Sequence, residues 1–215
     1  MHAGFINVDG EKMSKSLGNF FTIRDVIEKF HPEVVRYFIV SSHYRSPVNY
    51  SDVALKEAKN TLSRFYHSFK TYQAVYGDHL VETLDDALVE RFNAAMRDDF
   101  NTPEAIAVLF EINKELNRTV KEENAEQAAI YYATLRHLTN ILGLVQQDAD
   151  EFLKSDIGQE ALGLSPEQIE GLIQQRQDAK KAKEFSRADE IRQSLLDQGV
   201  VLEDTRQGTV WRRAD

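Results

Sequence analysis

Two lysines and two serines lie close together near the N-terminus, in the segment Lys12-Met13-Ser14-Lys15-Ser16. Ammonium and hydroxyl groups on one short loop suit the triphosphate of a nucleotide, because a compact ammonium neutralises phosphate charge. Placed where negative charge develops during a reaction, such groups also stabilise the transition state. The alternative interpretation is a solvated turn ahead of a helix, since runs of charged residues are usually exposed. The loop by itself does not decide between these interpretations.

The composition of the chain excludes several classes of protein. It has 215 residues, a formal net charge of −9 and no cysteine, which rules out a disulfide framework and thiolate metal sites. A hydrophobic content of 42% is enough for a core. No apolar run approaches the roughly 20 residues of a membrane span. We therefore expect a soluble, cytoplasmic protein with no membrane contact.

Charge is distributed unevenly along the chain. Residues 12–72 hold ten Lys and Arg against five Asp and Glu, whereas residues 73–164 hold seven against eighteen. Residues 165–215 are nearly balanced, with nine against ten. This pattern fits a polyanion that contacts the two ends while the acidic middle stands away from it. Acidic helices in an ordinary globular protein would give the same pattern.

The first half of the chain has the signals of a short strand followed by helices. Gly4 to Val8 alternates like a strand. Thr22 followed by Asp25 predicts a capping box, and Pro32 suits the first turn of a second helix. Ser51 caps a long third helix. The side chains expected to face the core of these helices are Val34, Val35, Phe38, Ile39, Leu55, Ala58, Leu62, Phe65, Phe69, Tyr72 and Tyr76.

The middle of the chain predicts an antiparallel helical bundle. Helices resume near Leu84, and Thr102 is a plausible cap with Pro103 as the first helical residue. A further helix from about Glu126 to Leu142 ends at Gly143, a favourable C-terminal stop. The apolar positions expected to be buried in this helix are Ile130, Leu135, Leu138 and Ile141.

The C-terminal part predicts a small module of two helices and a hairpin. Ser165 and the following Pro166 form a strong helix start, and Ile169, Leu172 and Ile173 give that helix a short apolar face. A second helix is expected over 186–197. The segments 200–202 and 209–211 read as strands around a turn at Arg206-Gln207-Gly208, with Trp211 in the core. The fold class is therefore mainly α, with a small C-terminal α/β module.

Several segments resemble one known family in the order in which they occur. The loop from Glu11 to Asn19 resembles the signature loop of class I aminoacyl-tRNA synthetases, and its surroundings are similar to cysteinyl-tRNA synthetase. The segments that carry this resemblance are Val35–Phe38, His43–Ser46, Asn49–Ser51, Asp98–Ala105, Ala188-Asp189, Leu202–Asp204 and Gly208–Arg213. The resemblance covers essentially the whole chain and identifies it as similar to a C-terminal fragment of a bacterial-type enzyme.

The resemblance implies a reaction and its partners. The family joins L-cysteine to ATP as cysteinyl-adenylate and passes the cysteinyl group to tRNA(Cys). Lys15 would contact ATP and stabilise charge on the departing pyrophosphate, with Lys12 in support and Ser14 and Ser16 contributing hydroxyls. The family also uses zinc, held largely by cysteine thiolates, and this chain has no ligands for it. We expect a monomer that is inactive in aminoacylation by itself.

The resemblance also implies a domain organisation. Residues 1–22 would end the catalytic domain, 23–76 would form stem-contact helices and 77–146 a helical bundle of the DALR type. Residues 147–164 would be a linker, and 165–215 an anticodon-binding module.

Within the last module, the family's anticodon contacts fall on Lys180, Phe185, Asp189 and Asp204. Relatives often have Arg and Trp at the first two positions. A carboxylate can accept from the N–H groups of guanine, and an aromatic ring can stack on an unpaired base. Four cations spaced i, i+4, i+7 and i+11 would form a phosphate-binding face if one helical turn persisted through them; the alternative is a solvated face. These cations are Arg176, Lys180, Lys183 and Arg187.

Two other functions remain open from the sequence. One is a stand-alone tRNA-binding module whose loop clamps phosphate without catalysis. The other is a relative that conjugates cysteine to a small amine, against which the anticodon-type module argues.

Overall fold

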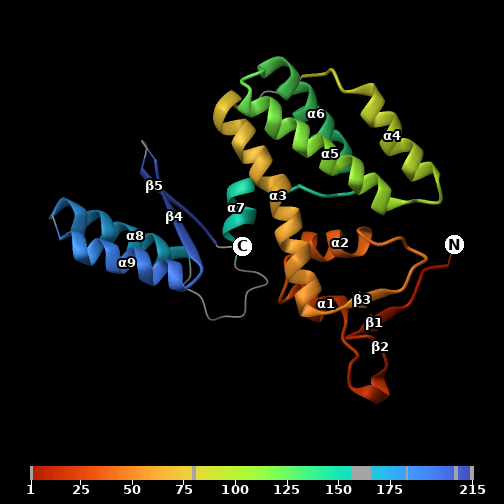
Figure 1. Cartoon of the computed structure of the whole chain (residues 1–215). Coiled ribbons are helices and arrows are strands. Elements are labelled where there is room, and N and C mark those ends of the chain that lie inside the picture. The colour runs from red at the N-terminus through yellow and green to blue at the C-terminus, as the bar shows by residue number, and fades with distance from the viewer. Residues whose placement is uncertain (1, 79–80, 156–165, 183, 206–207, 214–215) are drawn as a thin grey trace. The chain divides into compact units, whose positions relative to one another are not determined.

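The computed structural model describes residues 2–78, 81–155, 166–182, 184–205 and 208–213 (Figure 1). The chain divides into two compact units, Met1–Phe152 and Leu153–Asp215. Helices make up most of the described residues in both units. The expected fold class, mainly α with a small C-terminal α/β module, is confirmed.

The first unit begins with a small sheet whose strand order is β2-β1-β3. Strand β1 (Ile6–Val8) pairs antiparallel with β2 (Glu11–Lys12) and parallel with β3 (Val48–Tyr50). The parallel pair requires a crossover, which carries α1 (Ile23–Ile27) and α2 (Pro32–Val40). The strand expected near the N-terminus is confirmed as β1. Strands β2 and β3 are too short to show a sequence pattern and were not expected.

Local capping signals account for the starts of α1 and α2. The Asp25 N–H donates to Thr22 Oγ1 at 3.3 Å and the Thr22 N–H donates to Asp25 Oδ2 at 2.6 Å, so the capping box is confirmed. Pro32 is the first residue of α2. The expected burial of Ile39 is wrong, because it is 45% exposed and lines an apolar cavity, while Tyr37 is buried instead.

Helix α3 (Asp52–Tyr76) is the central element of the first unit and packs against α2, α5 and α6. It is joined by α4 (Asp86–Arg97), α5 (Thr102–Lys121) and α6 (Ala125–Ile141) (Figure 1). The apolar stripe from Leu55 to Tyr72 is buried as expected. Aromatic stacking contributes to this core: the rings of Tyr72 and Tyr132 lie 4.0 Å apart.

Two expectations for these helices are corrected. Ile141 is half exposed, because Leu135, Leu138 and Leu142 follow one another by steps of three and four and set the buried face to one side of it. At the start of α5 the cap is Asn101, whose Oδ1 accepts from the Glu104 N–H at 3.3 Å. Thr102 and Pro103 are consequently the first and second helical residues.

A buried carboxylate fixes the chain that follows α6. Glu33 is only 6% exposed, and its two oxygens accept from the Val145 N–H at 2.6 Å and the Gln146 N–H at 3.2 Å. The Tyr66 hydroxyl donates to the same carboxylate at 2.9 Å and accepts from the Gln147 N–H at 3.2 Å. This arrangement, here called the Glu33 bracket, satisfies three successive backbone N–H groups.

Helix α7 (Ala149–Lys154) follows the bracket and buries Phe152, whose ring stacks on Tyr66 at 4.0 Å. The first part of the proposed linker is thus helical and anchored to the first unit up to Phe152. Residues 156–165, which include the expected cap at Ser165, lie outside the described residues.

The second unit contains α8 (Pro166–Lys181), α9 (Phe185–Asp197) and the antiparallel strands β4 (Val200–Thr205) and β5 (Gly208–Arg213). Its core consists of Ile169, Ile173, Leu195, Val200, Leu202 and Trp211. The expected core position of Trp211 is confirmed, and its indole N–H donates to Glu170 Oε1 at 2.7 Å. Residues 206 and 207 of the expected turn lie outside the described residues.

Candidate functional site

The lysine loop is held by backbone turns and one asparagine. Asp9 and Gly10, with φ of 49° and 83°, turn the chain between β1 and β2, which suits a two-residue hairpin. Beyond β2, the Ser14 N–H donates to Asn19 Oδ1 at 2.8 Å. Ser14 also caps a short 3-10 helix, Lys15–Leu17, and its hydroxyl lies 2.7 Å from that of Ser16. The sequence therefore forms a closed loop with its polar groups on the surface.

The two ammonium groups of the loop lie over aromatic rings. Lys12 Nζ is 4.9 Å from the ring centre of Phe5, and Lys15 Nζ is 5.3 Å from that of Phe20. Neither lysine has an acidic partner among the residues that the structure describes. An exposed cation–π contact stabilises by only about 0.5–1 kcal/mol. Both ammonium groups are therefore available to a stronger anionic ligand.

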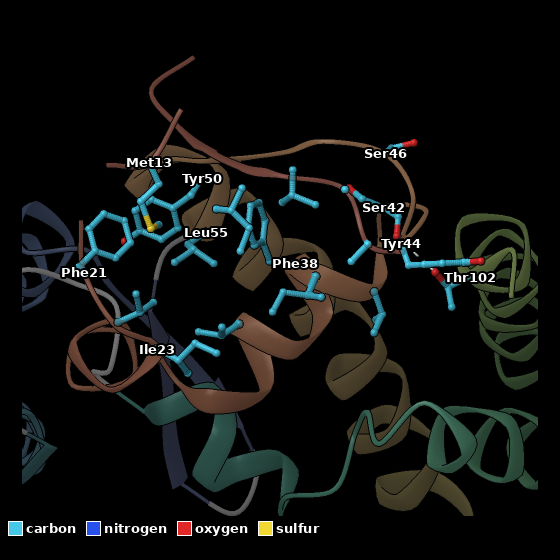
Figure 2. A pocket seen from close by; sticks show the side chains of 18 of the residues that line it. Met13, Phe21, Ile23, Phe38, Ser42, Tyr44, Ser46, Tyr50, Leu55 and Thr102 are labelled. Atoms are coloured by element: carbon cyan, nitrogen blue, oxygen red, sulfur yellow. Dashed lines mark hydrogen bonds between the residues drawn. The ribbon is translucent and has the colours of Figure 1, made fainter. Parts of the chain in front are cut away.

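An apolar cavity of about 520 Å³ lies next to this loop (Figure 2). Met13, from the middle of the loop, lines it together with Phe21, Phe38, Tyr50 and Leu55. The rings of Phe21 and Tyr50 lie 4.6 Å apart at its wall. Met13 thus seats the loop against apolar side chains, while the neighbouring lysines carry the charge at the surface.

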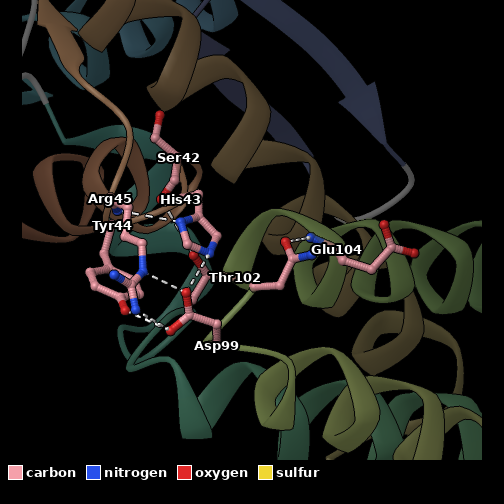
Figure 3. Close-up of polar contacts among 8 residues, drawn as sticks. Ser42, His43, Tyr44, Arg45, Asp99, Thr102 and Glu104 are labelled. Atoms are coloured by element: carbon pink, nitrogen blue, oxygen red, sulfur yellow. Dashed lines mark hydrogen bonds and ion pairs between the residues drawn. The ribbon is translucent and has the colours of Figure 1, made fainter. Parts of the chain in front are cut away.

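A second polar cluster joins two segments that the sequence had marked separately (Figure 3). Asp99, between α4 and α5, accepts from Arg45 Nε at 2.6 Å and from the Tyr44 hydroxyl at 2.6 Å. Hydrogen bonds from Arg45 and then Tyr44 lower the pKa of Asp99 to about 2. The same contact with Asp99 raises the pKa of Tyr44. The cluster connects the loop after α2 to the start of the bundle.

In the second unit the carboxylate of Asp204 accepts from three side chains. Arg176 approaches it in a bidentate manner, Nη1 to Oδ1 at 2.9 Å and Nη2 to Oδ2 at 2.9 Å. The Thr209 hydroxyl donates to Oδ1 at 2.7 Å, and Lys180 Nζ donates to Oδ2 at 3.0 Å. Hydrogen bonds from Arg176, then from Thr209 and Lys180, hold the pKa of Asp204 well below its ordinary value. We call these four residues the Asp204 cluster.

The expected stripe of four cations does not form one exposed face. Arg176 is only 2% exposed, because it binds Asp204 from the buried side of α8. Helix α8 ends at Lys181 and α9 begins at Phe185, so the four positions do not lie on one continuous helix. Arg187 is exposed beside Glu184, at 3.5 Å, and Lys183 lies outside the described residues.

The other predicted contact residues of this unit lie on its surface. Phe185 is the first residue of α9 and is 63% exposed, so its ring is not part of a core between α8 and α9. Asp189 is exposed one turn further along the helix. Its negative charge contributes to the raised pKa of Arg176, after the hydrogen bond from that guanidinium to Asp204.

Sequence reasoning missed the burial of Arg176 and the Glu33 bracket. A signal for Arg176 was present: it continues the apolar positions Ile169, Leu172 and Ile173 of α8 by steps of three, one and three, so it lies on the buried face. No local signal marks Glu33, because its partners Tyr66, Val145 and Gln146 follow it by 33, 112 and 113 residues.

Neither a metal site nor a membrane span is found in the described part of the chain. There, no group of three or more His, Asp or Glu side chains could hold a metal ion, and the sequence has no cysteine. The zinc implied by the resemblance therefore has no fitting ligand set in these residues. No helix among them is long and apolar enough to cross a membrane.

Three family models match successive parts of the chain. The catalytic domain of class I (C) tRNA synthetases matches residues 1–60, the DALR domain matches 91–146, and the cysteinyl-tRNA ligase anticodon binding domain matches 163–212. A solved ternary complex of LeuRS, tRNA and LeuAMS from Agrobacterium radiobacter K84 shares the fold, with a TM-score of 0.55, 20% identity, and coverage of 77% of this chain and 24% of that one. The class defined by fold and loop is that of the class I aminoacyl-tRNA synthetases.

Comparison with curated proteins identifies the family. The chain is 79% identical over 215 residues to the cysteine–tRNA ligase of Acinetobacter baylyi, covering 100% of this chain and 46% of that protein. It is 50% identical over 213 residues to the cysteine–tRNA ligase of Methylococcus capsulatus, covering 99% of this chain and 45% of that protein. The chain belongs to the cysteine–tRNA ligase family. It spans a little under half of the length of these relatives, and the resemblance read from the motifs is confirmed.

Proposed function

We propose that this chain is the part of a cysteine–tRNA ligase that carries its ATP-contacting loop and its tRNA-binding helices. The observation that carries the proposal is the 79% identity, over the whole chain, to a protein named cysteine–tRNA ligase. The complete enzyme would use ATP and L-cysteine to charge tRNA(Cys), in the cytoplasm and as a monomer. Its zinc would be held by residues other than those that the structure describes.

The loop has the chemistry for one step of that reaction. Adenylate formation transfers negative charge to the departing pyrophosphate, so cations placed there stabilise the transition state more than the ground state. Lys15 would bind the leaving phosphates directly, with Lys12 in support. The hydroxyls of Ser14 and Ser16, 2.7 Å apart, would donate to phosphate oxygens. Binding would exchange weak contacts with Phe5 and Phe20 for contacts with phosphate.

The second unit has the chemistry to bind an unpaired RNA loop. Phe185 offers an exposed ring for base stacking, which contributes about 1–3 kcal/mol per base. The carboxylates of Asp189 and Asp204 would accept from base N–H groups, and Lys180 and Arg187 would bind the phosphate backbone together with Lys183. Arg176 is excluded from direct backbone contact by its burial.

A chimeric enzyme tests the proposal. This chain would replace the corresponding residues of the Acinetobacter baylyi ligase, and the product would be assayed for charging of tRNA(Cys) and for ATP–pyrophosphate exchange. We expect charging within about tenfold of the parent. Lys15→Met should reduce exchange by roughly a hundredfold, the usual loss when one transition-state contact is removed. Lys29→Met, which removes a surface lysine outside the loop, is the matched control and should change exchange by less than about twofold.

Each outcome of this experiment bears on the proposal. Equal effects of the two lysine variants would contradict the role of the loop. A folded chimera that binds tRNA(Cys) and never charges it would contradict the ligase assignment and favour the stand-alone tRNA-binding module.

A further inference from the structure

Every acceptor position of the Asp204 carboxylate is occupied from within the chain. An ionised carboxylate offers about four lone-pair sites. Oδ1 accepts from Arg176 Nη1 and the Thr209 hydroxyl, and Oδ2 accepts from Arg176 Nη2 and Lys180 Nζ. A base N–H can therefore bind this carboxylate well only if one of these donors leaves.

The donors differ in how easily they can leave. The Arg176 side chain is 3% exposed, and its Nε has no hydrogen-bond partner among the residues that the structure describes. Its two terminal nitrogens bind Asp204 and the Thr209 beside it, so the guanidinium is committed to this cluster. Breaking this contact would leave a buried charge without a partner, which is strongly unfavourable. The Lys180 side chain is 42% exposed, and an ion pair at that degree of exposure contributes little to stability. Its flexible stem also allows the ammonium to move to a nearby phosphate.

The remaining donor, Thr209, belongs to the fixed part of the cluster. It extends from β5 directly opposite Asp204 on β4, and its 2.7 Å hydrogen bond to Oδ1 leaves that oxygen occupied. Oδ2 is consequently the one oxygen at which an exchange requires the movement of a single surface side chain.

We propose that Arg176 is a positioning residue that holds Asp204 for an RNA base, and that the Lys180 ammonium is the donor which that base replaces at Oδ2. The inference rests on the proposed function of this unit as an anticodon-binding module. The released ammonium then binds RNA phosphate, which carries no sequence information. The two cations that contact this carboxylate thus have different roles. Arg176 controls discrimination between bases, and Lys180 controls affinity for an RNA loop of any sequence.

The test measures discrimination and affinity separately. The full 215-residue chain is titrated with two labelled RNA hairpins at fixed salt: the anticodon hairpin of tRNA(Cys), and a copy in which the anticodon guanine is replaced by adenine. Adenine presents a lone pair at N1, where guanine presents an N–H, and it lacks the 2-amino group of guanine. It therefore has no donor at the positions from which guanine would donate to Oδ2. The readout is the ratio of the two dissociation constants, which a loss of folded protein alone would not change.

For the wild-type chain we expect a ratio of about tenfold or more, the usual effect of one base-specific contact. Arg176→Lys keeps the charge and removes the fork, and should reduce the ratio to less than about threefold while binding of the adenine hairpin stays within about twofold. Thr209→Val, a gentler change at the same carboxylate, should lower the ratio in the same direction. Arg192→Lys, at an exposed position of α9 to which no RNA contact is assigned, is the matched control and should leave the ratio unchanged.

Lys180→Gln should weaken binding of both hairpins by a similar factor of about two to five and preserve the ratio, as expected when one phosphate-binding cation is removed. Lys181→Gln, on the exposed side of the same helix, shows the effect of removing one charge that does not bind Asp204. A ratio that survives both Arg176→Lys and Thr209→Val contradicts the positioning role. A ratio that collapses in Lys180→Gln shows that the ammonium stays on Asp204, and contradicts the exchange. A wild-type chain without any preference would instead contradict the proposed function itself.

Discussion

Replacing Glu33 by glutamine should destabilise the first unit, because the Glu33 bracket joins α2 to a segment more than a hundred residues away. The carboxylate accepts from two backbone N–H groups, those of Val145 and Gln146, and from the Tyr66 hydroxyl. Glutamine offers one carbonyl oxygen and an NH₂ group, so at least one buried donor would face another donor.

The magnitude follows from the number of hydrogen bonds that glutamine cannot accept. A hydrogen bond to a charged group contributes about 1.5–3 kcal/mol, and a buried donor left without a partner costs a similar amount. If one hydrogen bond is removed and the others are retained in part, Glu33→Gln should lower the free energy of unfolding by about 2 kcal/mol. For a unit of this size that corresponds to a decrease of roughly 4–8 °C in Tm.

The chain offers a way to observe the two units separately. Its one tryptophan, Trp211, lies in the second unit, so tryptophan fluorescence follows that unit during denaturation. Far-UV circular dichroism is dominated by the longer helices of the first unit. Glu33→Gln should shift the circular dichroism transition to lower denaturant. Glu57→Gln, an exposed glutamate on α3, is the matched control and should change the free energy of unfolding by less than about 0.5 kcal/mol. A Glu33→Gln effect as small as that of the control would refute the bracket.

Three further predictions concern other parts of the chain. Phe185→Ala should weaken binding of tRNA(Cys) by about 5- to 30-fold because base stacking is removed, with an unchanged dichroism spectrum because the side chain is exposed; unchanged affinity would exclude the ring from the interface. The pKa of Asp99 is lowered to about 2, so the stability that its carboxylate contributes is present above its ordinary pKa of 3.8 and is lost as pH falls toward 2. In acid titration, Asp99→Asn should therefore lose stability less steeply over this pH range than the wild-type chain. Parallel curves for the two proteins would contradict this. A methyl group on Gly4 would lie 2.1 Å from the backbone oxygen of Ser46, so Gly4→Ala should destabilise the protein by about 1–3 kcal/mol. Gly171→Ala, in open space on a helix, should stabilise it by up to about 1 kcal/mol. If denaturant titrations gave changes of the same sign in the free energy of unfolding for both variants, this would count against the geometry at Gly4.

Features set by local sequence could be predicted, and those set by distant partners could not. The capping box of Thr22 and Asp25, the start of α2 at Pro32 and the stop at Gly143 each depend on a few neighbouring residues. The error at α5 is of the same local kind, since Asn101 and Thr102 are both good caps and only the geometry chooses between them.

The candidate site divides in the same way. The lysine loop and Phe185 could be marked as candidates by motif alone, and the structure places the side chains of Lys12, Lys15 and Phe185 on the surface. The burial of Arg176 depends on Asp204, which follows it by 28 residues, although its place on the apolar face of α8 was a usable signal. The contact of Tyr44 and Arg45 with Asp99 depends on packing of the bundle against the first helices, so the sequence could mark these segments and could not join them.

Binding of the chain to tRNA(Cys) tests the central claim most directly. Fluorescence anisotropy would compare intact tRNA(Cys) with a tRNA that differs from it only in its anticodon, at one stated salt concentration near physiological ionic strength, since affinities for nucleic acid depend steeply on salt. The proposed function predicts that the cognate tRNA binds at least about tenfold more tightly, because each mismatched base typically costs about 1–3 kcal/mol. Equal affinity for the two tRNAs, within about twofold, would contradict the assignment of the second unit as the part that reads the anticodon.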